Sequence, residues 1–347
     1  MVAGYRPETG CAASAERRGD LLLASAPPAE RWLLIECRDP WPRTALTALR
    51  RQPPTAKSAD RPPIPGDRQS ANEVPGDPGS LAAEVSRLCV AGRYRPVLIR
   101  RHGRIDKTAP RQWALVDSRP GFESVRWGEL PTDEHLLDVL AGKDQGTPST
   151  EPIYLVCTHG RHDACCAVRG RPAAAALSAA FPDRTWECSH VGGDRFAANL
   201  VFLPHSLFYG HVPADEAVEL AHAYDKGLLV PEFLRGSGAL NPPVQAAQHF
   251  ARAATVSLEG DNAATALAVD ALRPISVREL APNRWQVALD HHGRQITVEV
   301  AAQMITVDGA MTCAAVPPGR ARQFTLVNSV DLAEPGTTSP SGSVVGE

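Results

Sequence analysis

Two stretches near the middle of the sequence combine cysteine and histidine at spacings that suit metal chemistry. Four of the eight cysteines lie between positions 157 and 188. Thiolate sulfur is a soft ligand that favours iron–sulfur clusters, zinc or copper(I). Clustered cysteines in a reducing compartment indicate metal or redox chemistry more often than disulfides. The stretches that predict such a site are Cys157-Thr-His-Gly-Arg-His-Asp-Ala-Cys-Cys166 and Cys188-Ser-His-Val-Gly-Gly-Asp-Arg-Phe-Ala-Ala-Asn199.

The spacing of these cysteines separates the possible kinds of site. Eight residues lie between Cys157 and Cys166, whereas structural zinc sites usually pair ligands about two to four residues apart. A thioredoxin-type redox pair would need Cys-x-x-Cys, which is absent here. The spacing therefore favours an iron–sulfur cluster. A zinc site, thiol redox chemistry and a purely structural role for the adjacent Cys165 and Cys166 stay open at this point.

Both stretches follow short expected strands. Ile153–Val156 and Thr185–Ser189 are bounded by polar residues and predict strands. A helix is expected over Cys166–Ala180, with its regular part beginning near Pro172, because proline is best tolerated in the first turn of a helix. Loops that follow parallel strands meet at one edge of a sheet. The cysteines at 157 and 188 are therefore expected to lie close together.

The same order of elements occurs twice along the chain. Each block runs strand, helix, an intervening element, two strands and a helix, which matches a thioredoxin-like core. The sequence therefore predicts an α/β protein with two thioredoxin-like domains in tandem and a small β-rich C-terminal appendage. The expected boundaries are 1–141 for a degenerate thioredoxin-like N-terminal domain with a disordered insertion at 51–80, 151–254 for the thioredoxin-like domain that carries the two cysteine-rich stretches, 255–330 for the appendage and 334–347 for a disordered tail.

The C-terminal appendage shows the alternation of apolar and polar residues that is typical of half-buried strands. A helix is expected before it, at Val244–Ala254. Asp308-Gly309 is a turn signal. The strands expected here are Arg284–Leu289, Gln295–Val300 and Met304–Val307.

Composition excludes several classes of function. The net charge is −3 and 43% of the residues are hydrophobic, a balance that does not indicate nucleic-acid binding. No apolar run reaches the roughly 18 residues of a membrane span, and the N-terminus lacks a signal-peptide pattern. We therefore expect a cytoplasmic protein. Cys37, Cys89 and Cys313 are interpreted as small buried hydrophobic residues, and Cys11 receives no assignment.

The two cysteine-rich stretches resemble the sucrase/ferredoxin-like family, which belongs with the thioredoxin-like 2Fe-2S ferredoxins. The resemblance spans most of Cys11–Ala254, and the two central motifs are long and specific. Further stretches that resemble the family are Arg31–Glu36 with Trp41, and Leu234-Arg-Gly236 with Pro242–Ala247.

The resemblance implies that Cys157 and Cys166 bind one iron of a 2Fe-2S cluster. Some members carry His-x-x-x-His in the second loop as ligands of the other iron. His190 matches the first of these positions, but Asp194 stands at the second. We rank Cys188 slightly above Asp194 as the fourth ligand, because thiolate is the softer donor. Cys165 and His159 are lesser candidates.

Other polar residues near the motifs are expected to support the ligands. Metal ligands need hydrogen-bonded partners of their own, and arginines would offset the negative charge of a cluster. Gly192 and Gly193 are interpreted as room for the backbone to wrap around an inorganic core. The supporting residues predicted here are His159, Arg161, Asp163, Arg195 and Asn199.

These residues predict an electron-transfer protein, or the electron-transfer module of a reductase system, rather than a stand-alone enzyme. No nucleotide-binding fingerprint occurs, so we expect a separate reductase and a separate acceptor as redox partners. The alternatives are a thiol-dependent oxidoreductase that uses Cys165 or Cys166, and a zinc-stabilised binding module. Sucrase activity is not expected, because a glycosidase needs two carboxylates that flank the scissile bond and no motif indicates such a pair.

Overall fold

The computed structural model describes residues 6–51, 79–103, 106–259, 267–328 and 331–332. The predicted insertion at 51–80, apart from its ends, and the predicted tail at 334–347 lie outside the described residues. No helix in the described part of the chain is both long enough and apolar enough to cross a bilayer.

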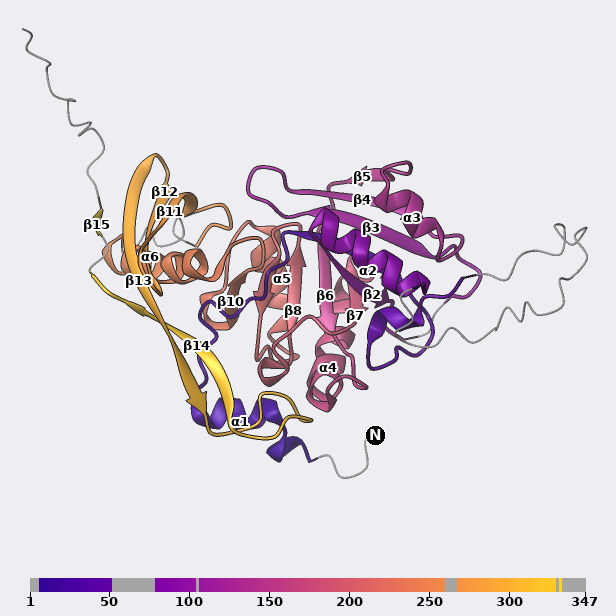
Figure 1. The fold of residues 1–347 in the computed structure, drawn as a ribbon, viewed down its shortest axis with the longest axis horizontal. Helices are drawn as coiled ribbons and strands as arrows, with labels where there is room; N and C mark the ends of the chain where they lie inside the picture. Colours follow the sequence, from indigo (N-terminus) through magenta and orange to yellow (C-terminus); the bar gives the residue numbers. More distant parts are fainter. Residues whose placement is uncertain (1–5, 52–78, 104–105, 260–266, 329–330, 333–347) are drawn as a thin grey trace, which may run out of the picture.

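The centre of the molecule is a mixed sheet of ten strands (Figure 1). Neighbouring strands are joined by backbone hydrogen bonds along its whole width. In spatial order the strands are β10 (Leu234–Ser237), β9 (Leu207–Tyr209), β8 (Leu200–Leu203), β6 (Ile153–Cys157), β7 (Thr185–Cys188), β2 (Tyr94–Arg100), β1 (Arg31–Glu36), β3 (Gln112–Asp117), β4 (Ser124–Glu129) and β5 (Thr147–Ser149).

The two halves of this sheet have the same topology. β1 lies parallel to β2 and antiparallel to β3, which pairs with β4. In the same way β6 lies parallel to β7 and antiparallel to β8, which pairs with β9. The halves join where β2 and β7 run antiparallel, with Ile99 opposite Cys188. The predicted α/β class is therefore confirmed, and the repeated thioredoxin-like order appears within one continuous sheet.

Alternate residues of the central strands face opposite sides of the sheet, as strand geometry requires. Leu33 and Ile35 of β1 pack in one core with helices α2 and α3. Tyr154 and Val156 of β6 pack in a second core with α4 and α5. The residues between them on each strand enter a third core, which both halves share. The helices are α1 (Cys11–Arg18), α2 (Leu81–Gly92), α3 (His135–Leu140), α4 (Ala164–Ala180), α5 (Ala217–Asp225) and α6 (Pro242–Glu259).

Helix α4 begins earlier than the sequence predicts. It starts at Ala164 and contains Pro172 in its interior, whereas the regular part was expected to begin near that proline. The Asp163 side chain accepts a hydrogen bond from the Cys165 amide and caps the helix. This cap supports about two helical turns before the proline, which brings Cys165 and Cys166 into the start of the helix.

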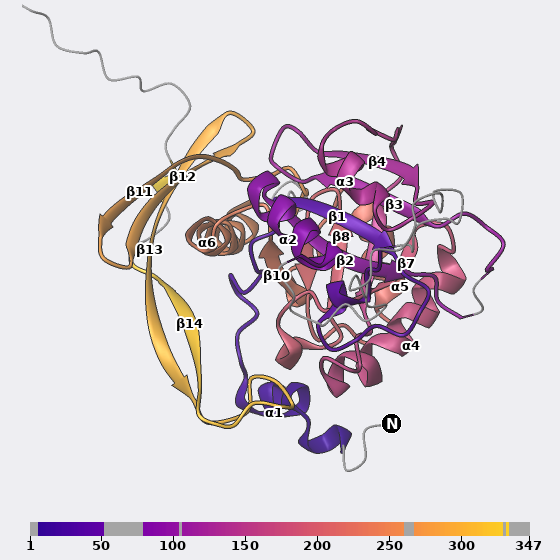
Figure 2. The same cartoon turned by 45° about the vertical axis from the view of Figure 1, so that its right-hand side comes forward.

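The C-terminal region forms a separate antiparallel sheet that packs against α6. Two of the expected strands are one long strand, β13, and β11 and β14 were not predicted because most of their side chains are exposed and the apolar alternation is weak. β13 and β14 continue as a two-stranded hairpin beyond the end of β12, and the loop between them reaches α1 (Figure 2). The strands are β11 (Arg273–Ala281), β12 (Arg284–His291), β13 (Arg294–Val307), β14 (Gly319–Leu326) and β15 (Asp331–Leu332).

Candidate metal centre

The first cysteine-rich stretch is a tight connection between a strand and a helix. Cys157 is the last residue of β6, and Cys166 lies in the first turn of α4. Gly170 of this helix lies directly against the Cys157 carbonyl, and a Cβ at this position would overlap that oxygen. The glycine therefore allows α4 to cross close to the end of β6. This close crossing sets the position of Cys166 relative to Cys157.

The second stretch is a loop held from behind by a buried arginine. Arg235 is 2% exposed, and its guanidinium donates to the Gly192 carbonyl at 2.9 Å and to Asn199 Oδ1 at 2.7 Å. Asn199 in turn donates through Nδ2 to the Gly193 carbonyl at 2.9 Å. Gly193 has a φ of 83°, and a side chain there would overlap Arg235. These contacts fix the path of the loop.

At this loop the structure changes one interpretation from the sequence and adds one residue that was not predicted. Gly192 and Gly193 were expected to make room for an inorganic core, but a Cβ on them would meet Pro27 and Arg235 respectively. Arg235 itself was not among the predicted site residues. Its signal in the sequence is the stretch Leu234-Arg-Gly236, which resembles the family although no local pattern indicates a role for the arginine.

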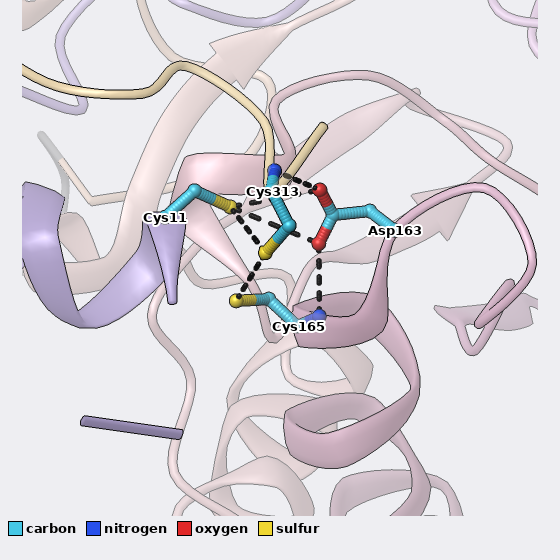
Figure 3. A group of neighbouring side chains, drawn as sticks. All are labelled: Cys11, Asp163, Cys165 and Cys313. Carbon is cyan, nitrogen blue, oxygen red and sulfur yellow. Dashed lines mark hydrogen bonds between the residues drawn. The ribbon is translucent and has the colours of Figure 1, made fainter. Parts of the chain in front are cut away.

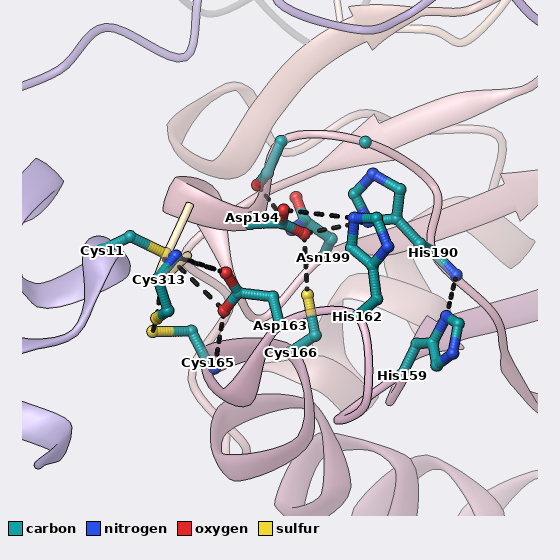
Figure 4. A network of polar contacts seen from close by, with 12 residues as sticks. Cys11, His159, His162, Asp163, Cys165, Cys166, His190, Asp194, Asn199 and Cys313 are labelled. Atoms are coloured by element: carbon teal, nitrogen blue, oxygen red, sulfur yellow. Dashed lines mark hydrogen bonds and ion pairs between the residues drawn. The ribbon is translucent and has the colours of Figure 1, made fainter. Parts of the chain in front are cut away.

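The two stretches bring four possible ligands together, and Figure 4 shows three of them, Cys166, His190 and Asp194. One ligand atom from each of Cys157, Cys166 and His190 lies within 4.8 Å of the others. Asp194 Oδ1 lies 2.9 Å from His190 Nδ1 and 3.3 Å from Cys166 Sγ. Cys188 is the register partner of Cys157 on β7 but does not belong to this group of converging atoms.

His159 supports the loop that carries His190. The ring nitrogen Nε2 lies 2.8 Å from the Pro42 carbonyl, which can only accept, so Nε2 carries the proton. The other nitrogen, Nδ1, accepts from the backbone amide of His190 at 3.3 Å. Burial lowers the pKa of His159 to about 4, so the ring is neutral at pH 7, as both contacts require. With both nitrogens engaged, His159 is placed to position the loop rather than to bind metal.

His162 adds an imidazole at the edge of the group. Its ring stacks on that of His190, with centroids 3.7 Å apart. Its Nε2 lies 3.5 Å from Asp194 Oδ2. The side chains of His162 and His190 are 28% and 27% exposed, whereas that of Asp194 is 2% exposed. The imidazole pair therefore forms the outer edge of a group whose carboxylate and thiols are buried.

The surroundings of the site favour a Cys157 thiolate next to a protonated His190. Contact with the Cys166 thiol outweighs the effect of burial, and together with the nearby His190 it lowers the pKa of Cys157 to about 5. The pKa of Cys166 is raised, first by that same contact. Burial opposes the charge of His190, but Asp194 and Cys157 raise its pKa to about 9.

Asp194 completes this arrangement. Burial disfavours its charge, but the contacts with His162 and His190 outweigh that effect and hold its pKa well below the usual range. A thiolate and a carboxylate thus lie together away from water, where the protonated His190 supplies the neighbouring positive charge that buried anions need. Thiol, imidazole and carboxylate are also the donor types that bind transition metals. The residues therefore fit a metal or an iron–sulfur cluster.

The other predicted supporting residues lie elsewhere. Arg161 is exposed. Arg195 forms an ion pair with Asp20 at 3.1 Å, and Asp163 turns toward Cys11 and Cys313. Of the supporting residues predicted from sequence, His159 and Asn199 contact the two loops that carry the candidate ligands.

Fold and site together define an α/β protein of repeated thioredoxin-like order with a buried donor set of cysteine, histidine and aspartate. The model of the sucrase/ferredoxin-like family matches residues 22–236. The chain belongs to this family, and the resemblance of its motifs is confirmed. No match was found among the curated proteins or among the solved structures.

Proposed function

We propose that this protein binds one 2Fe-2S cluster and serves as a ferredoxin-like electron carrier or as the electron-transfer module of a reductase system. The convergence of Cys157, Cys166, His190 and Asp194 at the ends of β6 and β7 carries this proposal. When bound, such a cluster supplies a centre that gains and loses single electrons. The partners are a separate reductase and a separate acceptor protein.

The contacts support one arrangement of ligands. Cys157 and Cys166 would bind one iron, and His190 with Asp194 would bind the other. Asp194 is favoured over Cys188 as the fourth ligand because its carboxylate touches both Cys166 and His190. This reverses the order that thiolate softness alone suggests, since proximity decides which donor is available.

Neighbouring residues place positive charge near the centre and exclude water from it. Burial lowers the pKa of Arg235 to about 9, which leaves its guanidinium charged at pH 7 near Asp194 and Cys157. On another side, Trp41 meets the His159 ring edge-on, with centroids 5.8 Å apart. Burial and nearby positive charge are among the factors that tune the potential of such centres.

The exposed edge of the site suggests a route for electrons. His190 is both a proposed ligand and partly exposed, and the His162 ring stacks on it at the surface. A partner that docks over these two imidazoles would lie close to the cluster without reaching the buried thiols. We therefore place the contact with redox partners at this edge.

Metal and sulfide analysis tests the proposal. Protein purified without air should contain about two iron and two acid-labile sulfide per chain and should be red-brown. A single zinc bound by the same residues, with no sulfide after reconstitution with iron and sulfide, would instead identify the zinc-stabilised binding module. Protein that carries no metal at this site and reduces disulfide substrates would identify the thiol oxidoreductase.

A further inference from the structure

Three cysteines that lie far apart in the sequence meet at a second place. They are Cys11 of α1, Cys165 at the start of α4 and Cys313 in the loop between β13 and β14 (Figure 3). Asp163, the capping residue of α4, joins them, and one ligand atom from each of the four residues lies within 4.8 Å of all the others. The family match at residues 22–236 does not include the first or the last of these cysteines.

The distances within this group suit a single tetrahedral ion. Cys313 Sγ lies 3.4 Å from Cys165 Sγ and 3.6 Å from Cys11 Sγ. Two thiolates on one tetrahedral zinc ion, each about 2.3 Å from the metal, lie about 3.8 Å apart. The sulfurs of a disulfide are only about 2.05 Å apart. The two contacts of Cys313 are nearly equal in length, and the sulfurs of Cys11 and Cys165 lie within 4.8 Å of each other. This arrangement matches a shared ion better than a bonded pair with one thiol left over.

Two backbone amides hold the Asp163 carboxylate in a position from which it could bind the same ion. Asp163 Oδ1 accepts from the Cys165 amide at 2.8 Å, and Oδ2 accepts from the Cys313 amide at 2.6 Å. Cys11 Sγ lies 3.7 Å from each of the two oxygens. Hydrogen bonds of this kind orient metal-binding carboxylates and leave a lone pair for the metal. The two amides come from two different segments, so the carboxylate already links α4 to the loop of Cys313.

Burial and helix position complete the site. Cys11, Asp163 and Cys165 are 2%, 3% and 0% exposed, whereas Cys313 is exposed and closes the outer side. The positive end of the helix dipole of α4 lies at Asp163 and Cys165, where it stabilises thiolate and carboxylate charge. Three buried donors and one exposed donor allow a metal to reach the site from the side of Cys313.

We propose that Cys11, Asp163, Cys165 and Cys313 form a second metal centre that binds one Zn²⁺ ion through three thiolates and one carboxylate. Binding displaces the three thiol protons, and no oxidation state changes. The ion joins three segments that no other covalent or metal link in the described residues connects, namely α1, α4 and the β13–β14 loop. Gly309 of that loop already packs tightly against Arg18 of α1.

The two centres would share the start of one helix. Cys165 turns to the zinc group and Cys166 to the group of His190 and Asp194 (Figure 4). Successive residues on a helix do not face the same side, so adjacent cysteines can serve two separate metals. The zinc ion would thereby add to the Asp163 cap, which already holds the N-terminus of α4.

Metal analysis of the full chain with single substitutions tests the proposal. Protein purified from medium that contains iron and zinc should carry about one zinc per chain in addition to any iron. Cys11→Ser and Cys313→Ser should each lose that zinc and keep the iron and sulfide of the wild type. Cys89→Ser, which changes a buried cysteine elsewhere, should keep both. Cobalt taken up in place of zinc should give the thiolate charge-transfer bands of a tetrahedral site, absent from Cys313→Ser.

The outcome does not depend on what the first centre holds. If the first centre binds zinc, the wild type should contain two zinc ions and Cys157→Ser one, and Cys313→Ser should still lose exactly that second ion. Zinc retained in both Cys11→Ser and Cys313→Ser would overturn the proposal. So would four irons and four sulfides per chain, or a metal-free protein with a disulfide between two of the three cysteines.

Hydrogen exchange tests the role of the ion. Removing zinc from the Cys157→Ser protein with a chelator should increase amide exchange in residues 308–318, and adding zinc should restore the protection. Exchange in β12, which lies within the separate sheet, should not change. Unchanged exchange in residues 308–318 would show that the ion does not fasten this loop.

Discussion

The two halves of the ten-stranded sheet share one topology but differ in the residues at corresponding strand ends. β1 ends at Glu36, opposite Ile99 of β2, and β6 ends at Cys157, opposite Cys188 of β7. Glu36 forms an ion pair with Arg38 at 2.7 Å and accepts from the Gln112 amide at 2.9 Å. The position of a possible metal ligand in one half is thus occupied by an ion pair in the other.

The connections after these strands differ as well. Helix α4 begins at Ala164, shortly after β6, whereas α2 begins only at Leu81, far along the chain from the end of β1. A short connection places the helix start next to the strand end, and the longer connection of the first half instead includes Trp41 and Pro42, which contact His159 of the second half. Repeated topology therefore supplies positions, and the loops and residue types decide which half can carry a metal.

The largest expected effect comes from removing the thiolate at the end of β6. Cys157→Ser should reduce the iron and sulfide content from about two of each to almost none, because oxygen replaces thiolate poorly in iron–sulfur clusters. The matched change in the other half, Glu36→Gln, should leave the iron content unchanged and lower the free energy of unfolding by about 1–3 kcal/mol through its buried contacts. Iron analysis and urea unfolding check the pair; equal iron loss in both variants would contradict the comparison.

The second effect separates two candidate ligands on the β7 side. Asp194→Ala should lose most of the cluster or bind it only transiently, because this carboxylate contacts both His190 and Cys166. Cys188→Ser should keep the cluster, since its sulfur lies outside the converging group. Visible absorption during anaerobic dialysis measures retention. A bleached Cys188→Ser protein beside a stable Asp194→Ala protein would restore the ranking based on thiolate softness.

A third prediction concerns the close crossing of α4 over β6. Gly170→Ala should lower the free energy of unfolding by about 1–3 kcal/mol, because a Cβ there overlaps the Cys157 carbonyl and the helix must shift. The shift should also weaken cluster retention, since Cys166 moves with the helix. Val168→Ala on the exposed side of α4 serves as the control and should change neither quantity. Chemical unfolding of metal-free protein separates the stability effect from metal binding.

The smallest expected effect tests whether Trp41, which belongs to the first half of the sheet, shields the metal centre of the second half from water and oxygen. Trp41→Phe removes the indole, which donates to the Cys37 carbonyl at 3.1 Å, and should cost about 1 kcal/mol of stability. A looser cover admits more water and oxygen, so the cluster should bleach in air a few-fold faster than in the wild type. Trp285→Phe, in the separate C-terminal sheet, should bleach at the wild-type rate. Bleaching at equal rates in all three proteins would show that the first half does not shield the centre.

Local patterns in the sequence determined much of the central sheet. Strands β6 and β7 lie close to where their apolar runs predict them, because a buried strand needs only a few consecutive apolar residues. The motifs identified the family, and the structure brings Cys157, Cys166, His190 and Asp194 together, although which of them bind a metal stays a prediction. Cys37 and Cys89 are buried as expected.

Features that depend on contacts between distant segments were decided by the tertiary structure. Cys313 was expected to be a buried hydrophobic residue, but it is exposed and meets Cys11 and Cys165. Nothing near any of these three cysteines in the sequence indicates the other two. The role of Arg235 likewise exists only because β10 lies behind the loop of Gly192 and Gly193. Periodicity and motif spacing report the chain's own neighbours, whereas a site assembled from α1, α4 and the β13–β14 loop follows from how whole elements pack.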